Sequence, residues 1–475
     1  MTTTHCRADW LPEDLAELTR QMACQPHGAE AGASRALERA ERLQSLCSLI
    51  HLDSDAVRTA ARQADALPPS AAAARPLHGI ALVIKDNIDV AGMPTTGGTP
   101  AMAGFIPRRP APVVERLMEA GAIILGKANL HELSRGVTGE NATYGAVRNP
   151  ADPGRISGGS SAGTAAAIAA GIVPAGIGTD TGGSLRIPAA LCGVVGMRPS
   201  GGRWPNEGIV PISRTLDTAG PMGRRVMDCA LLDAMVTGTP ATLEPAILAG
   251  LRLGVPRPYF WASLQPEVAS VMAAALDRLQ AQGVILVECE PEGVAEAESA
   301  IMTLTRYESI PALRAYFERH GQAFDPLAFA ERIASAQARR ALLDQLGAAA
   351  VTEHAYRDAL YVVRPRLMDH FAACFRNHAV EALVFPTTRL PASPLGQALH
   401  ELPGSPPVPT FTAFTRNTAP ASLASLPAIS MPAGVTREGL PVGLELDSPH
   451  GSDRRLLAIA MAIETALAAN VRADR

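Results

Sequence analysis

The sequence lacks the features that mark membrane proteins and nucleic-acid-binding proteins. No apolar run among its 475 residues is long enough to span a bilayer, and the N-terminus has no basic segment followed by an apolar core. The formal net charge is −4, so there is no excess of positive charge to attract nucleic acid or an anionic membrane surface. We therefore expect a cytoplasmic protein with no nucleic-acid partner and no membrane partner.

Metal and cofactor motifs are also missing. The seven cysteines are scattered and include no C-x-x-C pair, which argues against a disulfide framework and a zinc ribbon. His131-Glu132 is not followed by the second histidine of an H-E-x-x-H zinc motif, and Gly176-Ile177-Gly178 lacks the later glycine of a dinucleotide-binding fingerprint. We therefore expect neither a metal nor a cofactor.

Aromatic residues are scarce, at 4%, whereas glycine and other small residues are abundant and are concentrated between residues 157 and 200. Two serine sites flanked by glycine occur there, Gly158-Gly159-Ser160-Ser161 and Thr179-Asp180-Thr181-Gly182-Gly183-Ser184. Between them, the alanine-rich residues 162–171 predict a tightly packed helix and the apolar residues 172–177 predict a buried strand. The second serine site would join this strand to a helix at 185–192. Amides in such a loop can bind an anion or a developing oxyanion.

A lysine ends another predicted strand, in the segment His78-Gly79-Ile80-Ala81-Leu82-Val83-Ile84-Lys85-Asp86-Asn87. One interpretation of Lys85 is a charge at a strand end whose side chain extends to water. The other is a lysine desolvated enough to be neutral and to act as a base. The local sequence is compatible with both.

Together these elements resemble the amidase signature family of serine hydrolases. Residues 158–161 are similar to the family's GGSS element, residues 178–188 to its GTDTGGSxRxP element, and Lys85 to its catalytic lysine. The three elements stand in the family's order and spacing, over a likeness that covers residues 77–240 and resumes more weakly at 380–465. The resemblance implies an α/β fold with a large twisted mixed β-sheet covered by helices on both faces.

The resemblance also implies a catalytic triad of Lys85, Ser160 and Ser184. In that family the first serine follows a cis peptide bond. Ser184 would attack the acyl carbon, and Ser160 would pass the proton of Ser184 to a neutral Lys85. The amides of Thr181, Gly182, Gly183 and Ser184 would form the oxyanion hole.

Three further residues are expected to support the triad: Ser161, Asp180 and Arg186. Asp180 and Arg186 can equally be explained as a turn-stabilising cap and a buried ion pair. Two positions depart from the family's pattern, because Ala162 and Ser425 stand where glycine is common. Ala162 does not touch the triad, so we expect activity to be retained. Ser425 leaves the exact shape of the C-terminal pocket loop open.

The alternation of strand and helix patterns predicts α/β architecture around a largely buried sheet. We expect an N-terminal helical cap over residues 1–65 and one amidase signature domain over residues 66–475. That domain would contain a catalytic core at 77–240, a helical insertion at about 293–378 and a C-terminal return at 380–465. Residues 128–156 and 201–222 predict loops, and the first of these is long enough to be functional.

One competing motif lies inside the same stretch. Residues 159–163 match G-x-S-x-G, which would make Ser161 the nucleophile of an α/β-hydrolase esterase. That motif requires a buried strand directly before it, and residues 148–155 predict a loop. A scaffold without catalytic activity is the other alternative, and the presence of all three triad residues argues against it.

The substrate is expected to be a small-molecule amide or carbamate. Within the family, residues 188–193 and 439–446 are most similar to bacterial mandelamide and indoleacetamide hydrolases. This implies a broad hydrolase of aryl amides and arylacetamides, or a urethanase, that works as a monomer or homodimer. An allophanate- or biuret-type hydrolase and an amidotransferase A-type subunit with a partner remain alternatives.

The substrate pocket is expected to draw on the loop at 134–144, on Trp204 and on the segment 390–425, where a variable loop would set selectivity. Simple packing is an equal alternative for Tyr144 and Trp204. The candidate pocket residues are Ser134, Gly136, Thr138, Tyr144, Trp204, Phe411 and Phe414.

Overall fold

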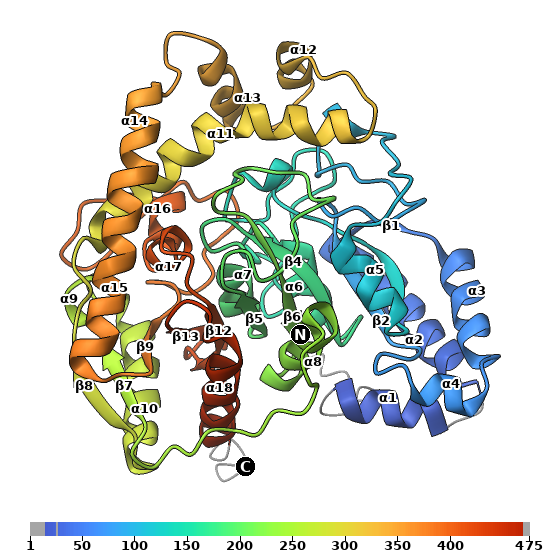
Figure 1. Cartoon of the computed structure of the whole chain (residues 1–475), viewed down its shortest axis with the longest axis horizontal. Helices are drawn as coiled ribbons and strands as arrows, with labels where there is room; N and C mark the ends of the chain where they lie inside the picture. The colour runs from blue at the N-terminus through green and yellow to red at the C-terminus, as the bar shows by residue number, and fades with distance from the viewer. Residues whose placement is uncertain (1–14, 25–26, 469–475) are drawn as a thin grey trace.

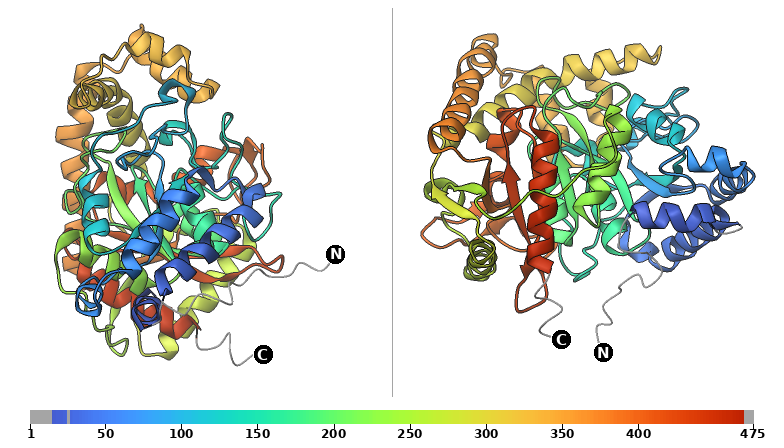
Figure 2. Two further views of the ribbon diagram at one scale, coloured as in Figure 1. Left: turned by 90° about the vertical axis from the view of Figure 1, so that its right-hand side faces the viewer. Right: turned by 60° about the horizontal axis from the view of Figure 1, so that its bottom comes forward.

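The computed structural model describes residues 15–24 and 27–468, which are organised around an 11-stranded mixed β-sheet with helices on both faces (Figures 1 and 2). The strand order is β1-β3-β2-β4-β6-β5-β12-β13-β9-β7-β8. The strands of this sheet are β1 Leu49–Leu52, β2 Ala81–Lys85, β3 Ile123–Ala128, β4 Ala175–Asp180, β5 Val195–Arg198, β6 Thr218–Gly223, β7 Arg252–Val255, β8 Ile285–Glu288, β9 Ala382–Pro386, β12 Ala428–Val435 and β13 Pro441–Asp447. A small hairpin pairs β10 (Leu399–His400) with β11 (Val408–Pro409). The predicted α/β fold with a large mixed sheet is confirmed.

The helices divide between the two faces and the helical insertion. Their bounds are α1 Leu15–Cys24, α2 Gly28–Arg42, α3 Ser54–Asp65, α4 Pro69–Ala73, α5 Pro112–Glu119, α6 Ala162–Ala169, α7 Arg186–Cys192, α8 Val226–Thr237, α9 Arg257–Phe260, α10 Pro266–Ala281, α11 Ala297–Arg319, α12 Pro326–Glu331, α13 Ala336–Leu343, α14 Glu353–Asp358, α15 Arg364–His378, α16 Thr410–Thr415, α17 Ala419–Leu423 and α18 Asp453–Ala468. A π-helical turn over Ala359–Val363 joins α14 to α15. None of the helices in the described ranges combines the length and the apolarity needed to cross a membrane.

Alternation along β2 determines which of its side chains face α6 and the loop that contains Ser160. Leu82 and Ile84 pack in a cluster with α5 and α8, whereas Ala81 and Val83 pack in a different cluster with α2 and α6. Since side chains alternate between the two faces of a strand, Lys85 follows Ala81 and Val83. It therefore lies on the α6 face, next to the serine loop that precedes α6.

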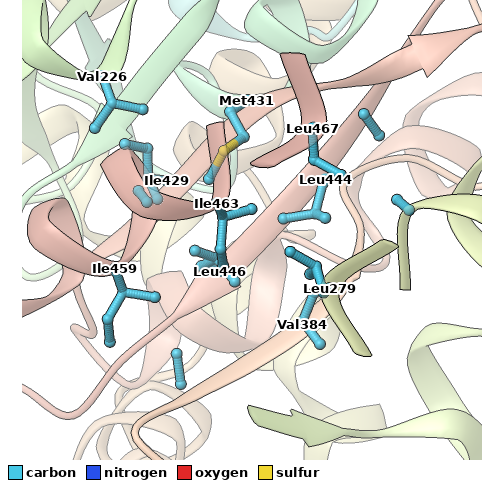
Figure 3. Packing of buried hydrophobic residues seen from close by; sticks show 14 of the residues in the cluster. Val226, Leu279, Val384, Ile429, Met431, Leu444, Leu446, Ile459, Ile463 and Leu467 are labelled. Atoms are coloured by element: carbon cyan, nitrogen blue, oxygen red, sulfur yellow. The ribbon is translucent and has the colours of Figure 1, made fainter. Parts of the chain in front are cut away.

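The C-terminal half of the sheet has its own core (Figure 3). Ile429 and Met431 on β12 and Leu444 and Leu446 on β13 are fully buried against α8, α10 and α18. Burial of these apolar side chains, which contributes about 25 cal/mol per Å² of area removed from water, is a strong source of stability. It fixes β13, which also carries the buried Glu445.

The insertion between β8 and β9 is helical, as predicted. It consists of α11 to α15 and the short segments between them, and it lies along the top and left of Figure 1. A cluster of aromatic and aliphatic side chains, among them Tyr316, Phe317 and Phe329, packs it against the loop that contains Phe105.

Three secondary-structure expectations were wrong. The N-terminal segment 1–65, expected to be a helical cap, also contains β1, which pairs with β3; its residues 1–14 and 25–26 lie outside the described residues. The segment 201–222, predicted as a loop, contains most of β6, whose glycines allow close approach of its neighbours: a Cβ at Gly220 would lie 2.3 Å from the carbonyl oxygen of Met197. The strand predicted at 172–177 begins three residues later, at Ala175.

Candidate active site

Lys85 is fully buried at the end of β2 and contacts two hydroxyl groups. Its Nζ donates to Ser160 Oγ at 2.7 Å and to Thr179 Oγ1 at 2.8 Å. Thr179 lies on β4, which runs parallel to β2 with Ile177 opposite Ile84, so the pairing places the two residues close together at the same end of neighbouring strands. Asn87 Nδ2 also donates to Thr179 Oγ1, at 3.1 Å.

Burial changes the protonation of this lysine. It lowers the pKa of Lys85 from 10.5 to about 7, although the negative charges of Asp180 and Asp217 act in the opposite direction. A large fraction of the amine is therefore neutral near pH 7. A neutral amine 2.7 Å from a serine hydroxyl can accept its proton.

Ser160 belongs to a loop whose backbone is held from two sides. The Gly159–Ser160 peptide bond is cis, as the family resemblance implies. The carbonyl of Ser160 accepts a hydrogen bond from the His131 amide at 3.2 Å. The loop ends where α6 begins, and this helix packs on the Lys85 face of the sheet.

Ser161 is directed at β4 and is fully buried. Its Oγ donates to the Thr179 carbonyl at 3.1 Å and accepts from the Thr179 amide at 3.2 Å, and its amide donates to the Ser184 carbonyl at 3.2 Å. These contacts connect the two serine loops to each other. The residues before Ser161 make only isolated β-bridges, so the strand that a G-x-S-x-G nucleophile requires is not present in this described segment.

Ser184 lies in the loop between β4 and α7, half-exposed on the wall of a cavity. Thr181 and Gly182 line the same cavity. The Gly183 amide instead donates to Asp180 Oδ1 at 2.9 Å, so one of the four amides predicted for the oxyanion hole already has a protein acceptor. Gly183 has φ +132°, and a Cβ there would lie 2.2 Å from Thr418 Oγ1.

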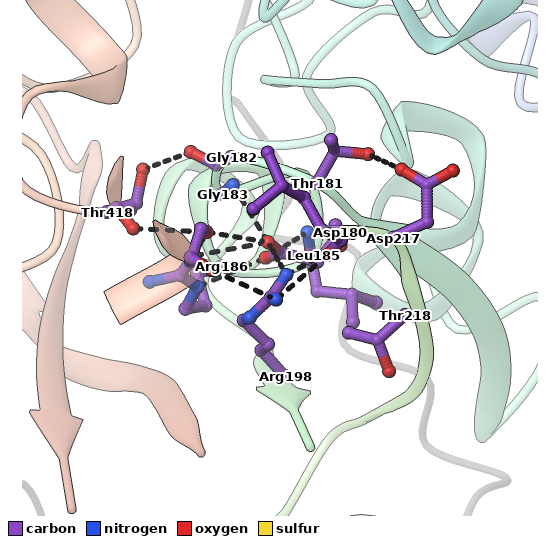
Figure 4. Close-up of polar contacts among 12 residues, drawn as sticks. Asp180, Thr181, Gly182, Gly183, Leu185, Arg186, Arg198, Asp217, Thr218 and Thr418 are labelled. Atoms are coloured by element: carbon purple, nitrogen blue, oxygen red, sulfur yellow. Dashed lines mark hydrogen bonds and ion pairs between the residues drawn. The ribbon is translucent and has the colours of Figure 1, made fainter. Parts of the chain in front are cut away.

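Asp180 is the centre of a buried charge network beneath this loop (Figure 4). Arg186 Nε and Nη2 each donate to its carboxylate at 3.1 Å, and Arg198 Nη1 donates to it at 3.0 Å. Burial alone would raise the pKa of Asp180, but the two guanidinium groups hold it below the usual range. Arg186 also donates to Glu445 Oε1 on β13 at 2.6 Å, so the network connects the serine loop to the C-terminal half of the sheet.

Several partners in this network are far apart in sequence and were missed. Thr181 Oγ1 donates to Asp217 Oδ1 at 2.6 Å, and Arg186 Nη2 donates to Ser422 Oγ at 2.7 Å. Thr179 was the one partner that a local signal could have revealed, because it falls inside the quoted motif, two residues after the strand predicted at 172–177. The roles of Arg198, Asp217 and Glu445 depend on tertiary contacts that no local pattern specifies.

The cavity next to Ser184 has a volume of about 280 Å³. Its walls come from the loop at 134–137, from the Ser184 loop, from the helical insertion and from α16, and they are mainly apolar. Residues from the insertion were not foreseen, because the sequence does not indicate which helical faces close over the site. The lining residues are Ser134, Arg135, Gly136, Val137, Thr181, Gly182, Ser184, Ile187, Ile212, Ile301, Met302, Thr305, Arg306, Gln337, Ala341, Phe411 and Thr415.

Three of the predicted pocket residues therefore line the cavity: Ser134, Gly136 and Phe411. Thr138 and Tyr144 do not, and Thr138 Oγ1 lies 3.3 Å from His131 Nδ1.

Trp204 and Phe414 are core residues instead. Trp204 is fully buried on the other face of the sheet, where its Nε1 donates to Asp233 Oδ1 at 2.9 Å. Phe414 is fully buried and packs edge-on against His400.

The two departures from the family pattern have different surroundings. Ala162 is the first residue of α6 and is fully buried in a small cluster with Val147 and Ala166. Ser425 has φ 58°, a left-handed conformation that favours glycine, and its hydroxyl accepts from Arg364 Nη2 at 2.8 Å. The glycine common at position 425 is thus explained by backbone conformation.

Two groups of potential metal ligands occur in the described part of the chain, and neither includes a residue of the cavity. Cys289, Cys374 and His378 form the first group. In the second, Asp65 accepts from the amides of Ala29 and Glu30 at the start of α2, which accounts for its position there.

The chain is similar to known amidases over most of its length. A family model described as Amidase matches residues 33–457. The indoleacetamide hydrolase of Agrobacterium vitis is 39% identical over 91% of this chain and 92% of its own, and the mandelamide hydrolase of Pseudomonas putida is 40% identical over 82% and 79%. The structure of the peptide amidase from Stenotrophomonas maltophilia superposes with a TM-score of 0.84 at 30% identity, over 96% of this chain and 97% of that one.

The fold, the site and these similarities define an amide-hydrolysing enzyme. The chain belongs to the Amidase family, and the predicted resemblance to that family is confirmed.

Proposed function

We propose that this enzyme hydrolyses aryl amides and arylacetamides through an acyl-enzyme on Ser184, with Ser160 and Lys85 as the proton relay. The observation that carries the proposal is the 2.7 Å contact between Lys85 Nζ and Ser160 Oγ, with the pKa of the lysine at about 7, beside a cavity that Ser184 lines. A serine hydroxyl becomes an effective nucleophile only when a base takes its proton.

The proposed reaction has two halves. Ser184 Oγ attacks the amide carbon, its proton passes to Ser160, and the Ser160 proton passes to neutral Lys85. The C–N bond then breaks as the leaving amine takes a proton back through Ser160. Water attacks the acyl-enzyme by the same relay and releases the carboxylic acid and free Ser184.

The oxyanion of each tetrahedral intermediate would be bound by the amides of Thr181, Gly182 and Ser184. Gly183 is left out of this set because its amide donates to Asp180. Asp180 and Arg186 would hold the loop in position from below, and Ser161 would hold it from the side of β4. Loss of one oxyanion donor typically raises the barrier by about 3 kcal/mol.

The substrate class follows from the cavity and from the relatives. Ile187, Ile212, Ile301 and Phe411 give the cavity apolar walls that suit an aryl group. Two relatives are named as hydrolases of indoleacetamide and mandelamide, and each of these compounds is a short amide that carries an aryl group. A carbamate differs from an amide by one ester oxygen, so the same relay would also cleave N-aryl carbamates.

The test uses three substrates: an acetanilide, an N-aryl carbamate and a primary arylacetamide. Release of aniline or nitroaniline reports cleavage of the first two, and release of ammonia reports cleavage of the third. The purified chain is assayed alone, without ATP, glutamine or added metal, beside Ser184→Ala. We expect turnover by the wild type that is lost in Ser184→Ala, and cleavage of the carbamate would add urethanase activity. Turnover that survives in Ser184→Ala would contradict the assignment of the nucleophile. No turnover of any substrate would contradict an amidase that works without a partner subunit.

A further inference from the structure

Two arginines line the catalytic cavity, and their positions are not explained by the proposed reaction. Arg135 lies in the loop after β3 and Arg306 lies on α11 of the helical insertion. They are the charged residues among those that line this cavity, and no carboxylate lines it. The cavity that Ser184 lines is therefore mainly apolar, with two positive charges and no negative one among its lining residues.

Both guanidinium groups have an enclosed nitrogen without a partner. Arg135 Nη2 and Arg306 Nε are buried and make no hydrogen bond within the described residues. No ion pair to either arginine occurs in the same ranges. Because an enclosed polar atom without a hydrogen-bond partner is costly, arginine nitrogens inside folded proteins are normally paired with carboxylates or other acceptors.

The neighbouring carboxylate is already committed to other donors. Asp217 accepts from Thr181 Oγ1 at 2.6 Å through Oδ1 and from the amides of Ile212 and Ser213 at 2.8 and 3.0 Å through Oδ2. Burial lowers the pKa of Arg135 to about 10, Asp217 opposes this change, and the positive charge of Arg306 adds to it. Both guanidinium groups line the same cavity, so one anion bound there would offset the repulsion between their charges.

We propose that Arg135 and Arg306 form an anion-binding subsite, so that the preferred substrates are amides or carbamates that carry a carboxylate remote from the scissile bond. The inference rests on the proposed function and specifies its substrate class. A planar guanidinium binds a carboxylate through paired, charge-assisted hydrogen bonds, and two of them can bind both carboxylate oxygens. The apolar walls would contact the part of the substrate between the carboxylate and the carbonyl.

The main test compares a charged and a neutral substrate with the same reacting bond. Glutaryl-4-nitroanilide and its methyl ester place the carboxylate on the acyl side, and the acetanilide of 4-aminobenzoate with its methyl ester places it on the amine side. We expect the wild type to have a higher kcat/KM for the acid than for the ester in at least one of these pairs. The preference should appear mainly in KM, because the subsite is occupied before and during the reaction.

The arginine variants identify the source of that preference. In Arg135→Gln and Arg306→Gln, the acid-to-ester ratio of kcat/KM should fall about 10- to 100-fold, the usual effect of losing a hydrogen bond to a charged group. Arg135→Lys and Arg306→Lys should recover part of the ratio. Arg314→Gln is the matched control, because Arg314 is an exposed arginine on the same helix outside the cavity, and its ratio should equal that of the wild type. A ratio that favours the ester in both pairs, or that is unchanged in both glutamine variants, would overturn the proposal.

A binding measurement separates this inference from the proposed function. Glutaryl-4-nitroanilide and its methyl ester are titrated into Ser184→Ala protein by calorimetry, together with the amine-side pair. In one outcome, an acid binds Ser184→Ala more tightly than its ester does, and this difference is lost in the double variant Ser184→Ala/Arg306→Gln. That outcome supports the subsite even if the wild type turns over none of these compounds. Equal or weaker binding of both acids overturns the subsite even if turnover proves the enzyme to be a serine amidase.

Discussion

Replacement of Lys85 by methionine should abolish activity and at the same time stabilise the protein. Methionine has nearly the same length and volume but no charge, so it can occupy the buried site at the end of β2 without a cavity. The relay would lose its base, because Ser160 would have no group to which it can pass a proton. We expect kcat/KM to fall by at least about 1,000-fold, which is usual when an enzyme loses the base that activates its nucleophile.

The expected gain in stability follows from the lysine's pKa. The amine is fully protonated in the unfolded chain at pH 7, whereas burial lowers the pKa of Lys85 in the folded protein to about 7. At about 1.4 kcal/mol per pKa unit, this burial costs the fold roughly 4 kcal/mol at pH 7. The methionine variant avoids that cost but loses the hydrogen bonds to Ser160 and Thr179, each about 1 kcal/mol. A net increase of roughly 2 kcal/mol in the free energy of unfolding remains.

The pH dependence gives the prediction a definite sign. Between the folded pKa of about 7 and the unfolded value of 10.5, the unfolded chain binds more protons at Lys85 than the folded one, so wild-type stability rises with pH. The advantage of Lys85→Met should thus be largest below pH 7 and shrink towards pH 10. Wild-type kcat/KM should fall about tenfold per pH unit below pH 7, as the base becomes protonated.

The assays are urea unfolding of both proteins from pH 6 to 9 and a pH profile of wild-type turnover. Lys127→Met is the matched control: Lys127 is also fully buried, but its Nζ lies 3.2 Å from Asp86 Oδ1. Loss of that charge would leave Asp86 unpaired and lower the free energy of unfolding by about 3–5 kcal/mol. Retained activity in Lys85→Met, or a loss of stability at pH 6 comparable to that of Lys127→Met, would refute the argument.

Three further changes have definite expected outcomes. Phe411→Ala should alter the ranking of aryl substrates with little loss of stability, because Phe411 lines the cavity. Phe414→Ala should lower the free energy of unfolding by about 3–5 kcal/mol, because Phe414 is fully buried and does not line the cavity. An equal loss of activity on every substrate in Phe411→Ala would count against its place in the pocket. Gly183→Ala should reduce kcat at least about 100-fold, because its Cβ would meet Thr418 Oγ1 and displace the loop that carries the proposed oxyanion donors. Steady-state kinetics near the wild-type rate would contradict this. Arg186→Met should destabilise the protein by about 3–5 kcal/mol in urea unfolding by leaving its carboxylate partners unpaired, and a stable variant would show that the network is dispensable.

Much of the fold could be predicted because local pattern and tertiary structure agree. The β2 segment is an apolar run with a lysine at its end, and it forms a buried strand. The helix at 162–169 follows from alanine propensity, and the insertion at 293–378 follows from its helical periodicity. Among the strands that were missed, β1 and β5 are short and β6 is rich in glycine and proline. Their pairing depends on backbone approach between distant segments, which propensity does not measure.

The candidate site also has a part that the sequence predicts and a part that it does not. The serine and lysine motifs are local, and the resemblance to a family put them together before any contact was known. The pocket is not local: Arg306, Gln337 and Phe411 come from three helices that close over the site, and Trp204 was chosen for its side-chain type although its position is on the other face of the sheet. The commitment of the Gly183 amide to Asp180 likewise depends on the three-dimensional turn.

The central claim is that Ser184 carries the acyl group, and mass spectrometry of the trapped intermediate tests it most directly. Wild-type protein is mixed with an activated 4-nitrophenyl ester of an arylacetic acid, quenched in acid within the first turnovers and digested. We predict an arylacetyl adduct on Ser184 that is absent from Ser184→Ala and that does not accumulate in Lys85→Met. An adduct on Ser161 or Ser160, or an adduct that persists in Ser184→Ala, would contradict the account.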